Sequence, residues 1–233
     1  MESKHAELPV FADTVRDFDV RTLREVDRVV GGLSGSRLVV TGSYAVEMLT
    51  RVPLSHDDID INVFTEDKAT DLPQIAIKLE SLDSYRPYMQ TDSGLGYFVG
   101  SRHGSFTPRR LEMQFVEVEE ASEFASVFTL KGTDFAVPTV SLPLVDSAGS
   151  ESIFRVKSLS FLIATWAIRI SGAAEKQKRD VRASDVDHFR LLLTRDHDRE
   201  DVLLAMSRHP QMPKGIPESK VLSDALRKAN NTL

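Results

Sequence analysis

The stretch VVTGSYAVEMLTRVPLSHDDIDINVF, residues 39–64, determines the expected fold and the expected site. It begins with an apolar run that ends at Gly42, continues as a helix-like segment from Ser43, and closes in a strictly alternating segment. In that last segment Asp58 and Asp60 point to one side of the expected strand, because successive side chains of a strand alternate between its faces. Like charges that lie close together repel each other. A bound cation that needs both carboxylates is a strong reason to place them there.

A third carboxylate is expected from RRLEMQFVEV, residues 109–118, which we interpret as the second strand of a hairpin. Glu112 lies opposite the apolar face of this strand. Glu117 has the parity of the apolar side and would need a β-bulge, and Glu119 lies beyond the strand end. Mg²⁺ prefers oxygen ligands, and two such ions stabilise the attacking and leaving oxygens of phosphoryl transfer. We therefore predict a site for two Mg²⁺ ions that is formed by Asp58, Asp60 and Glu112.

The Gly42–Ser43 step supplies the complementary chemistry. Glycine lets the backbone approach a ligand closely. A helix that is capped by Ser43 would present free N–H groups, which bind anions, and the serine hydroxyl adds a donor for a phosphate oxygen. We therefore predict that Gly42 and Ser43 bind the phosphates of a nucleotide beside the metal site.

The composition excludes several classes of protein. A chain of 233 residues with 41% hydrophobic content can bury a core, and the lack of cysteine excludes disulfides and thiolate metal sites. With a net charge of −6, binding to nucleic acid would need a local basic patch. The apolar run FLIATWAI is too short to span a bilayer, and the first residues lack the features of a signal peptide. We expect a cytoplasmic protein with no membrane partner.

The order of the expected elements divides the chain into two domains. Residues 1–150 alternate between helices and strands, whereas residues 151–233 are mainly helical. Residues 85–97 are interpreted as a polar loop flanked by Tyr85, Tyr88 and Tyr97, which could stack on a base or an acceptor or could be ordinary aromatic anchors of a surface loop. Residues 120–128 are interpreted as a short helix. The expected fold class is α+β, with a mixed sheet flanked by helices and followed by a helical C-terminal part.

Taken together, these features resemble the nucleotidyltransferases of the DNA polymerase β superfamily. The shared pattern is a strand, Gly-Ser, a helix, a strand with Asp-x-Asp and a later strand with a third acid. The segments VVTGSYAVEML, DDIDINVF and RRLEMQF carry it, within residues 37–115. Within the superfamily the chain is most similar to the abortive-infection type nucleotidyltransferase toxins of bacteria.

The resemblance implies a role for each residue of the pattern. Ser43 would hold oxygens of a nucleoside triphosphate such as ATP. Asp58 and Asp60 would bind Mg²⁺, and Glu112 would help to activate the hydroxyl group of the acceptor. The resemblance also implies that a toxin of this type has a cognate antitoxin as its partner.

The second half of the chain departs from the pattern of the toxins. Their Lys-Asp step is matched by Asp185, which would contact the nucleotide, but Ser184 occupies the position of the lysine. An earlier helix lysine is also missing, because Trp166 or a neighbour falls at its position. Arg169, one turn later, could reach the triphosphate instead. Other cationic candidates are Lys176, Lys178 and Arg179.

Three functions remain open at this point. The first is Mg²⁺-dependent transfer of a nucleoside monophosphate to an acceptor hydroxyl, with tRNA, protein or a small molecule as the acceptor. The second is a degenerate member of the fold that binds a nucleotide or a partner without turnover, which the missing lysine motivates. The third is an antibiotic nucleotidyltransferase of the aminoglycoside type, because acidic residues suit a polycationic drug.

Overall fold

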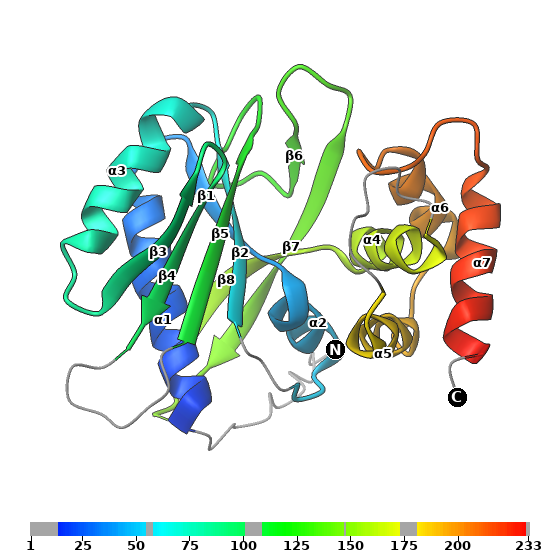
Figure 1. Cartoon of the computed structure of the whole chain (residues 1–233), viewed down its shortest axis with the longest axis horizontal. Helices are drawn as coiled ribbons and strands as arrows, with labels where there is room; N and C mark the ends of the chain where they lie inside the picture. Colours follow the sequence, from blue (N-terminus) through cyan, green and yellow to red (C-terminus); the bar gives the residue numbers. More distant parts are fainter. Residues whose placement is uncertain (1–13, 55–57, 101–108, 147, 173–180, 232–233) are drawn as a thin grey trace, which may run out of the picture.

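A mixed sheet forms the centre of the fold (Figure 1). The computed structural model describes residues 14–54, 58–100, 109–146, 148–172 and 181–231. In this part of the chain eight strands lie in the order β3-β4-β5-β2-β1-β8-β7-β6 and are accompanied by seven helices. The strands are β1 (Ser36–Val40), β2 (Asp58–Thr65), β3 (Tyr85–Thr91), β4 (Gly94–Val99), β5 (Arg109–Glu117), β6 (Val127–Thr129), β7 (Ala136–Val145) and β8 (Glu151–Lys157). The helices are α1 (Thr14–Gly31), α2 (Gly42–Thr50), α3 (Lys68–Glu80), α4 (Leu159–Ser171), α5 (Ala183–Leu193), α6 (Arg199–Ser207) and α7 (Glu218–Asn231).

Strand β2 lies at the centre of the sheet and pairs on both sides. It is antiparallel to β1, with Ile61 opposite Val40, and parallel to β5, with Asp60 opposite Glu112. On its other side β1 pairs in parallel with β8, with Val40 opposite Val156. A parallel pair requires a long crossover, so this pairing brings together residues that are far apart in the sequence.

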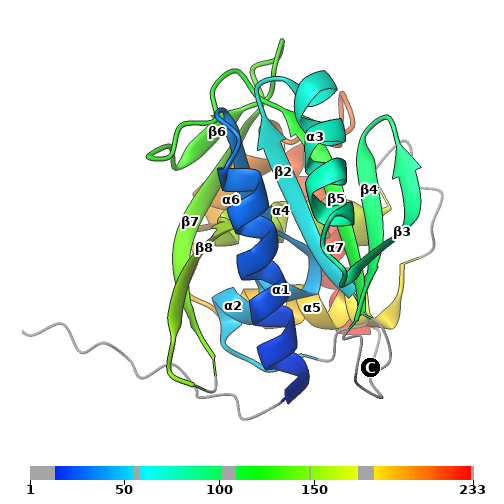
Figure 2. The same ribbon diagram turned by 90° about the vertical axis from the view of Figure 1, so that its left-hand side faces the viewer.

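Helices α1 and α3 cover one face of the sheet, as Figure 2 shows. The residues of β2 that face them, Ile59, Ile61 and Val63, are at most 1% exposed and share one core with both helices. Because side chains alternate along a strand, Asp58 and Asp60 point to the opposite face. The predicted fold class, α+β with a mixed sheet and a helical C-terminal part, is confirmed.

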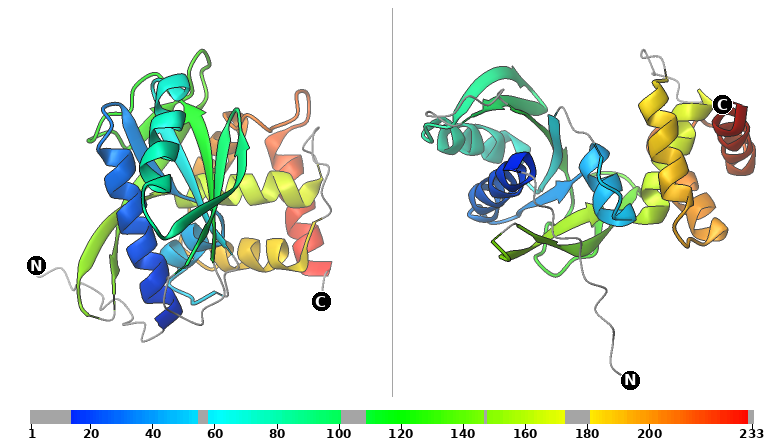
Figure 3. Two further views of the ribbon diagram at one scale, coloured as in Figure 1. Left: turned by 60° about the vertical axis from the view of Figure 1, so that its left-hand side comes forward. Right: turned by 90° about the horizontal axis from the view of Figure 1, so that it is seen from below.

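Helix α2 lies between the sheet and helices α4 to α7, as the view from below shows (Figure 3). Ser158 alone joins β8 to α4, and its hydroxyl caps the helix by accepting the N–H of Phe161 at 3.3 Å. The sheet therefore extends beyond residue 150. We propose that the boundary between the two predicted domains, 1–150 and 151–233, is at Ser158.

The C-terminal helices pack around α4. Eight of its thirteen residues are buried, among them Trp166, which is 7% exposed. Among the described helices, none combines the length and the apolar character that crossing a bilayer requires.

Two expectations for local structure were wrong. The segment 85–97 is not a polar loop, because β3 and most of β4 form an antiparallel hairpin there, with a register shift between Pro87 and Met89. The proline, the irregularity and the exposed side chains of this edge strand hide its periodicity. The segment 120–128 is not helical: it is irregular and ends in β6. There the side chain of Glu66 accepts the N–H of Ala121 at 2.8 Å, and the N–H of Glu119 donates to the carbonyl oxygen of Thr129 at 2.9 Å, so these hydrogen bonds join the start of the segment to other parts of the chain.

Candidate active site

The candidate site lies along one row of residues that crosses the sheet. Asp60 on β2 is opposite Glu112 on β5, and Glu112 is opposite Gly96 on β4. On the other side, the N–H of Thr41 donates to the carbonyl oxygen of Asp60 at 3.1 Å. Neighbouring strands lie about 4.8 Å apart, so side chains that leave this row on the same face meet.

Three carboxylates converge on the open face, as predicted. Oxygen atoms of Asp58, Asp60 and Glu112 lie within 4.8 Å of one another, and each side chain is partly buried. Burial, together with the negative charges of Asp58 and Glu112, raises the pKa of Asp60 to about 6. This concentration of negative charge is unfavourable unless a cation neutralises it. The donor set consists entirely of carboxylate oxygens, which is the chemistry that Mg²⁺ requires.

Side chains from β3 and β5 hold two of these carboxylates. The hydroxyl of Tyr88 donates to Oε1 of Glu112 at 2.9 Å, and Nη2 of Arg110 lies 3.4 Å from Oδ2 of Asp58. Each of these contacts orients a carboxylate without closing the site, because Tyr88 and Arg110 remain partly exposed.

The turn into α2 is in direct contact with Asp60. Gly42 has φ of +61°, and a Cβ atom built on it would lie 2.3 Å from Oδ2 of Asp60. Glycine is required here both by the left-handed backbone and by this contact. Thr41 occupies the N-cap position, so the expectation that Ser43 caps the helix was wrong; Ser43 lies in the first turn of α2. The N–H groups of a first turn have no acceptor within the helix.

Lys157 is a basic residue at the site that the sequence analysis missed. It follows Val156, which is opposite Val40, so Lys157 at the end of β8 lies beside Thr41. Burial lowers the pKa of Lys157 to about 8, against the opposing effect of the nearby charge of Asp60. Among the described residues, no carboxylate forms an ion pair with its Nζ atom, which lies 5.8 Å from the centroid of the Phe161 ring. Lys157 is brought to the site by the parallel pairing of β1 with β8. The periodicity of a single segment does not reveal such a pairing.

Arg169 and Asp185 contact each other in the helical part. Nη2 of Arg169 lies 3.4 Å from Oδ2 of Asp185, and the guanidinium lies 5.0 Å from the centroid of the Trp166 ring. The pKa of Asp60 is raised overall, but the positive charge of Arg169 opposes this rise. Arg169 is therefore close enough to act on the carboxylates. Asp185 is 2% exposed and accepts the N–H of Arg182 at the start of α5. Asp185 thus stabilises α5 and positions Arg169.

The remaining candidates fall elsewhere. Glu117 lies at the far end of β5, near Lys131 and Lys68 at 3.7 and 3.9 Å, and Glu119 accepts the N–H of Gly132. Neither carboxylate belongs to the cluster that Asp60 forms. The other cationic candidates, Lys176, Lys178 and Arg179, lie outside the described residues.

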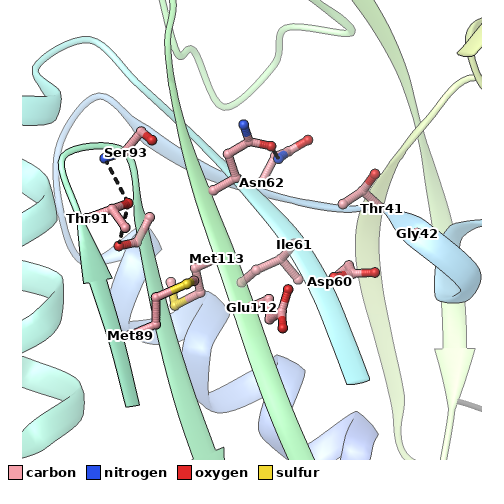
Figure 4. A pocket seen from close by; sticks show the side chains of 12 residues that line it. Thr41, Gly42, Asp60, Ile61, Asn62, Met89, Thr91, Ser93, Glu112 and Met113 are labelled. Carbon is pink, nitrogen blue, oxygen red and sulfur yellow. Dashed lines mark hydrogen bonds between the residues drawn. The ribbon is translucent and has the colours of Figure 1, made fainter. Parts of the chain in front are cut away.

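A pocket of about 400 Å³ adjoins the carboxylates (Figure 4). One end is formed by Asp60 and Glu112 with the backbone of the turn before α2. The other end is lined by uncharged polar side chains between β2 and the β3–β4 hairpin, and there Nδ2 of Asn62 donates to Oε1 of Gln114 at 3.5 Å. An elongated ligand could therefore contact the acidic cluster and an uncharged hydrogen-bonding surface at once. The pocket is lined by Thr41, Gly42, Asp60, Ile61, Asn62, Met89, Thr91, Ser93, Gly94, Glu112, Met113 and Gln114.

The structure resembles solved nucleotidyltransferases. The aminoglycoside nucleotidyltransferase ANT(2″)-Ia, solved in complex with adenylyl-2″-tobramycin, is similar with a TM-score of 0.52. The match covers 83% of this chain and 96% of that chain at 19% sequence identity. The chain has a nucleotidyltransferase fold. At this identity the likeness establishes the fold alone.

The other comparisons with known proteins add nothing to the assignment of the fold. No family model matches the sequence, and no curated protein matches it. A cytoplasmic RNA terminal U-transferase matches with a TM-score of 0.33 and 17% identity, over 46% of this chain and 31% of that chain. A likeness of that size supports no argument about function.

Proposed function

We propose that this protein is a Mg²⁺-dependent nucleotidyltransferase, which transfers a nucleoside monophosphate from a nucleoside triphosphate to an acceptor hydroxyl. The observation that carries this proposal is the convergence of Asp58, Asp60 and Glu112 within 4.8 Å, directly against the backbone of Gly42. A carboxylate cluster alone would be a metal site. A carboxylate cluster in contact with an anion-binding turn is suited to a metal-bound polyphosphate.

Each residue of the cluster has a definite task in this reaction. Asp58 and Asp60 would hold Mg²⁺, with two ions in the full site, which supplies charge neutralisation to the transferring phosphoryl group. Glu112 is aligned by Tyr88 and would accept the proton of the acceptor hydroxyl. The acceptor oxygen then forms a bond to the α-phosphorus, and the bond from that phosphorus to the bridging oxygen breaks. Pyrophosphate leaves with the electron pair of that bond.

The triphosphate would lie between the turn and two cations. Gly42 and Ser43 would provide backbone N–H groups, and the serine hydroxyl a further donor. Lys157 lies beside Thr41, and Arg169 acts on Asp60 from the helical part, so both can compensate the negative charge of a triphosphate. Asp185 would act on the nucleotide through Arg169.

The finer assignments are a further part of the proposal. As a toxin of the abortive-infection type, the protein would act in the cytoplasm, and its activity would be blocked by an antitoxin. The acceptor would be tRNA, protein or a small molecule. An aminoglycoside belongs among the acceptors to be tested because the structural neighbour ANT(2″)-Ia was solved with an adenylylated aminoglycoside.

A transfer assay tests the proposal directly. The protein is incubated with each α-labelled nucleoside triphosphate and Mg²⁺, in the presence of total RNA, cell protein or a panel of aminoglycosides. We expect label on one class of acceptor, and no label with the Asp60→Asn variant. Calorimetry with the unlabelled triphosphates is run in parallel. Binding of triphosphate without label transfer or pyrophosphate release would contradict the proposal and would favour a nucleotide-binding protein without turnover.

A further inference from the structure

The β3–β4 hairpin places a tyrosine ring across the row of the active site. A Cβ atom on Gly96 would lie 2.8 Å from Cζ of Tyr88 and 3.1 Å from its Cε1 atom, so the ring lies directly over this glycine. From there the hydroxyl reaches Glu112 on the next strand at 2.9 Å. Gly96 has no side chain, and this allows the ring to lie along the sheet surface next to the carboxylates.

A second aromatic side chain extends this surface. The ring of Phe98 lies 4.6 Å from that of Tyr88, centroid to centroid, with a tilt of 37° between their planes. Phe98 is 41% exposed and Tyr88 is 37% exposed. Two exposed aromatic rings in contact provide a surface on which a planar group can stack.

Two arginines flank this aromatic pair. Phe98 is opposite Arg86 on β3 and opposite Arg110 on β5, and both arginines belong to the exposed residues. Guanidinium groups on both sides of a ring attract phosphodiester groups and repel a polycation. Arg110 also lies 3.4 Å from Oδ2 of Asp58, so Arg86 supplies most of the positive charge of this surface. Its guanidinium favours the phosphates of a nucleic acid over a polycationic aminoglycoside.

We propose that Arg86, Tyr88, Phe98 and Arg110 form an acceptor platform, and that the acceptor is the unpaired end of a single-stranded nucleic acid. This inference rests on the proposed nucleotidyl transfer and names its acceptor. The terminal base stacks on Tyr88 and Phe98, and the arginines bind the phosphates that precede it. Since Tyr88 itself touches Glu112, a terminal ribose hydroxyl beside the ring lies within reach of the carboxylate that accepts its proton.

Binding of a short single-stranded RNA and of DNA with the same sequence, each labelled at the 5′ end, tests the inference without turnover. Fluorescence anisotropy is measured with Mg²⁺ and without triphosphate. We expect Phe98→Leu to weaken binding roughly tenfold, within the range of base–aromatic stacking. Phe124→Leu is the matched control, because Phe124 is 92% exposed and lies outside the acceptor platform, between β5 and β6; its affinity should equal that of the wild type.

A second pair of variants tests the charges. Arg86→Gln should lower affinity for the oligonucleotide and reduce the slope of log affinity against log salt by about one. Arg21→Gln, on α1 at the opposite face of the sheet, should change neither. Equal binding by Phe98→Leu and the wild type would overturn the inference, as would equal binding of a blunt duplex, whose bases are already stacked.

The outcome is separable from that of the nucleotidyltransferase proposal. Calorimetry should give the same triphosphate affinity for Phe98→Leu and the wild type, because Phe98 is opposite Arg110 and not in the row of Asp60. Label transfer to an aminoglycoside or a protein, with no affinity for oligonucleotides, would retain the enzyme and reject the acceptor platform. Affinity for oligonucleotides that depends on Phe98 in a protein without turnover would retain the platform and reject the enzyme.

Discussion

Asp60 lies against the backbone of Gly42, so that even a methyl group at Gly42 would lie 2.3 Å from the Oδ2 atom of the carboxylate. Gly42 also has φ of +61°, which residues with a side chain rarely adopt. The turn that begins α2 and the carboxylate on β2 are therefore one packed unit. A change in either one displaces the other.

Replacement of Gly42 by alanine should damage both stability and transfer. We expect a loss of about 1–2 kcal/mol in the free energy of unfolding from backbone strain, measured by urea denaturation. Transfer should fall by about a hundredfold, the size of effect that a small misplacement of reacting groups can have. Gly132→Ala is the matched control: Gly132 has φ of +70° and no heavy atom within 4 Å of an added Cβ. Gly132→Ala should lose stability but keep transfer activity. Equal transfer activity of the two variants would contradict the inference that Gly42 and Asp60 form one packed unit.

Asp60→Asn should abolish transfer and yet stabilise the metal-free fold. The raised pKa of Asp60 means that its ionised form is disfavoured where it lies, so a neutral side chain relieves repulsion. In a chelator at pH 7 we expect the variant to be more stable by about 1 kcal/mol. Adding Mg²⁺ should raise the melting temperature of the wild type and leave that of the variant almost unchanged. Equal stabilisation of both proteins by Mg²⁺ would place the metal elsewhere.

Lys157→Met should weaken triphosphate binding roughly tenfold, because a charge-assisted hydrogen bond is lost. Calorimetry measures this, with Lys131→Met on the β6–β7 turn as the control. The pKa of Lys157 is about 8, so the wild type should lose affinity as the pH rises through this value and the ammonium group deprotonates. Lys157→Met should lack this step. A step of the same size in the variant would assign it to another group.

His209 should make the fold sensitive to acid. It is 5% exposed, its Nε2 atom lies 3.1 Å from Oγ1 of Thr165, and burial with the charge of Lys157 lowers its pKa to about 4. Between pH 6.5 and about 4 the unfolded chain binds a proton at this histidine and the folded chain does not, so stability falls as the pH falls. The loss at pH 4 is up to about 3 kcal/mol.

Urea denaturation across this pH range measures the effect. His209→Gln should flatten the dependence of stability on pH, and His197→Gln, in the connection between α5 and α6, should leave it as in the wild type. An unchanged slope for His209→Gln would show that other groups cause the sensitivity to acid.

The face to which each carboxylate of the cluster points was predictable, because the alternation of side chains along a strand is local. The period of two in a strand fixes the face of Asp58 and Asp60, and the same rule applied to a later strand selects Glu112 over Glu117. That β2 and β5 are neighbours does not follow from this rule; it was expected from the resemblance to the nucleotidyltransferases, and the sheet pairs the two strands in parallel. Three residues from two segments were found in this way.

Lys157, and the contact of Tyr88 with Glu112, could not be found by the same reasoning. Lys157 reaches the site because β8 pairs with β1 in parallel, and no pattern within either strand specifies that partner. Tyr88 reaches Glu112 because the backbone of β3 shifts register between Pro87 and Met89. The direction of its side chain therefore does not follow from the alternation of side chains along a regular strand. Both positions depend on contacts between strands, and these are properties of the whole sheet.

The single-residue connection at Ser158 has a mechanical consequence. Since β8 ends at Lys157 and α4 begins at Leu159, a tilt of the C-terminal helices against the sheet would pull directly on the lysine that faces Asp60. Arg169 is carried on the same helix and would move with it. Closure of the helical half over a substrate would thus move Lys157 and Arg169 together. Domain movement would in this way change the affinity for the triphosphate.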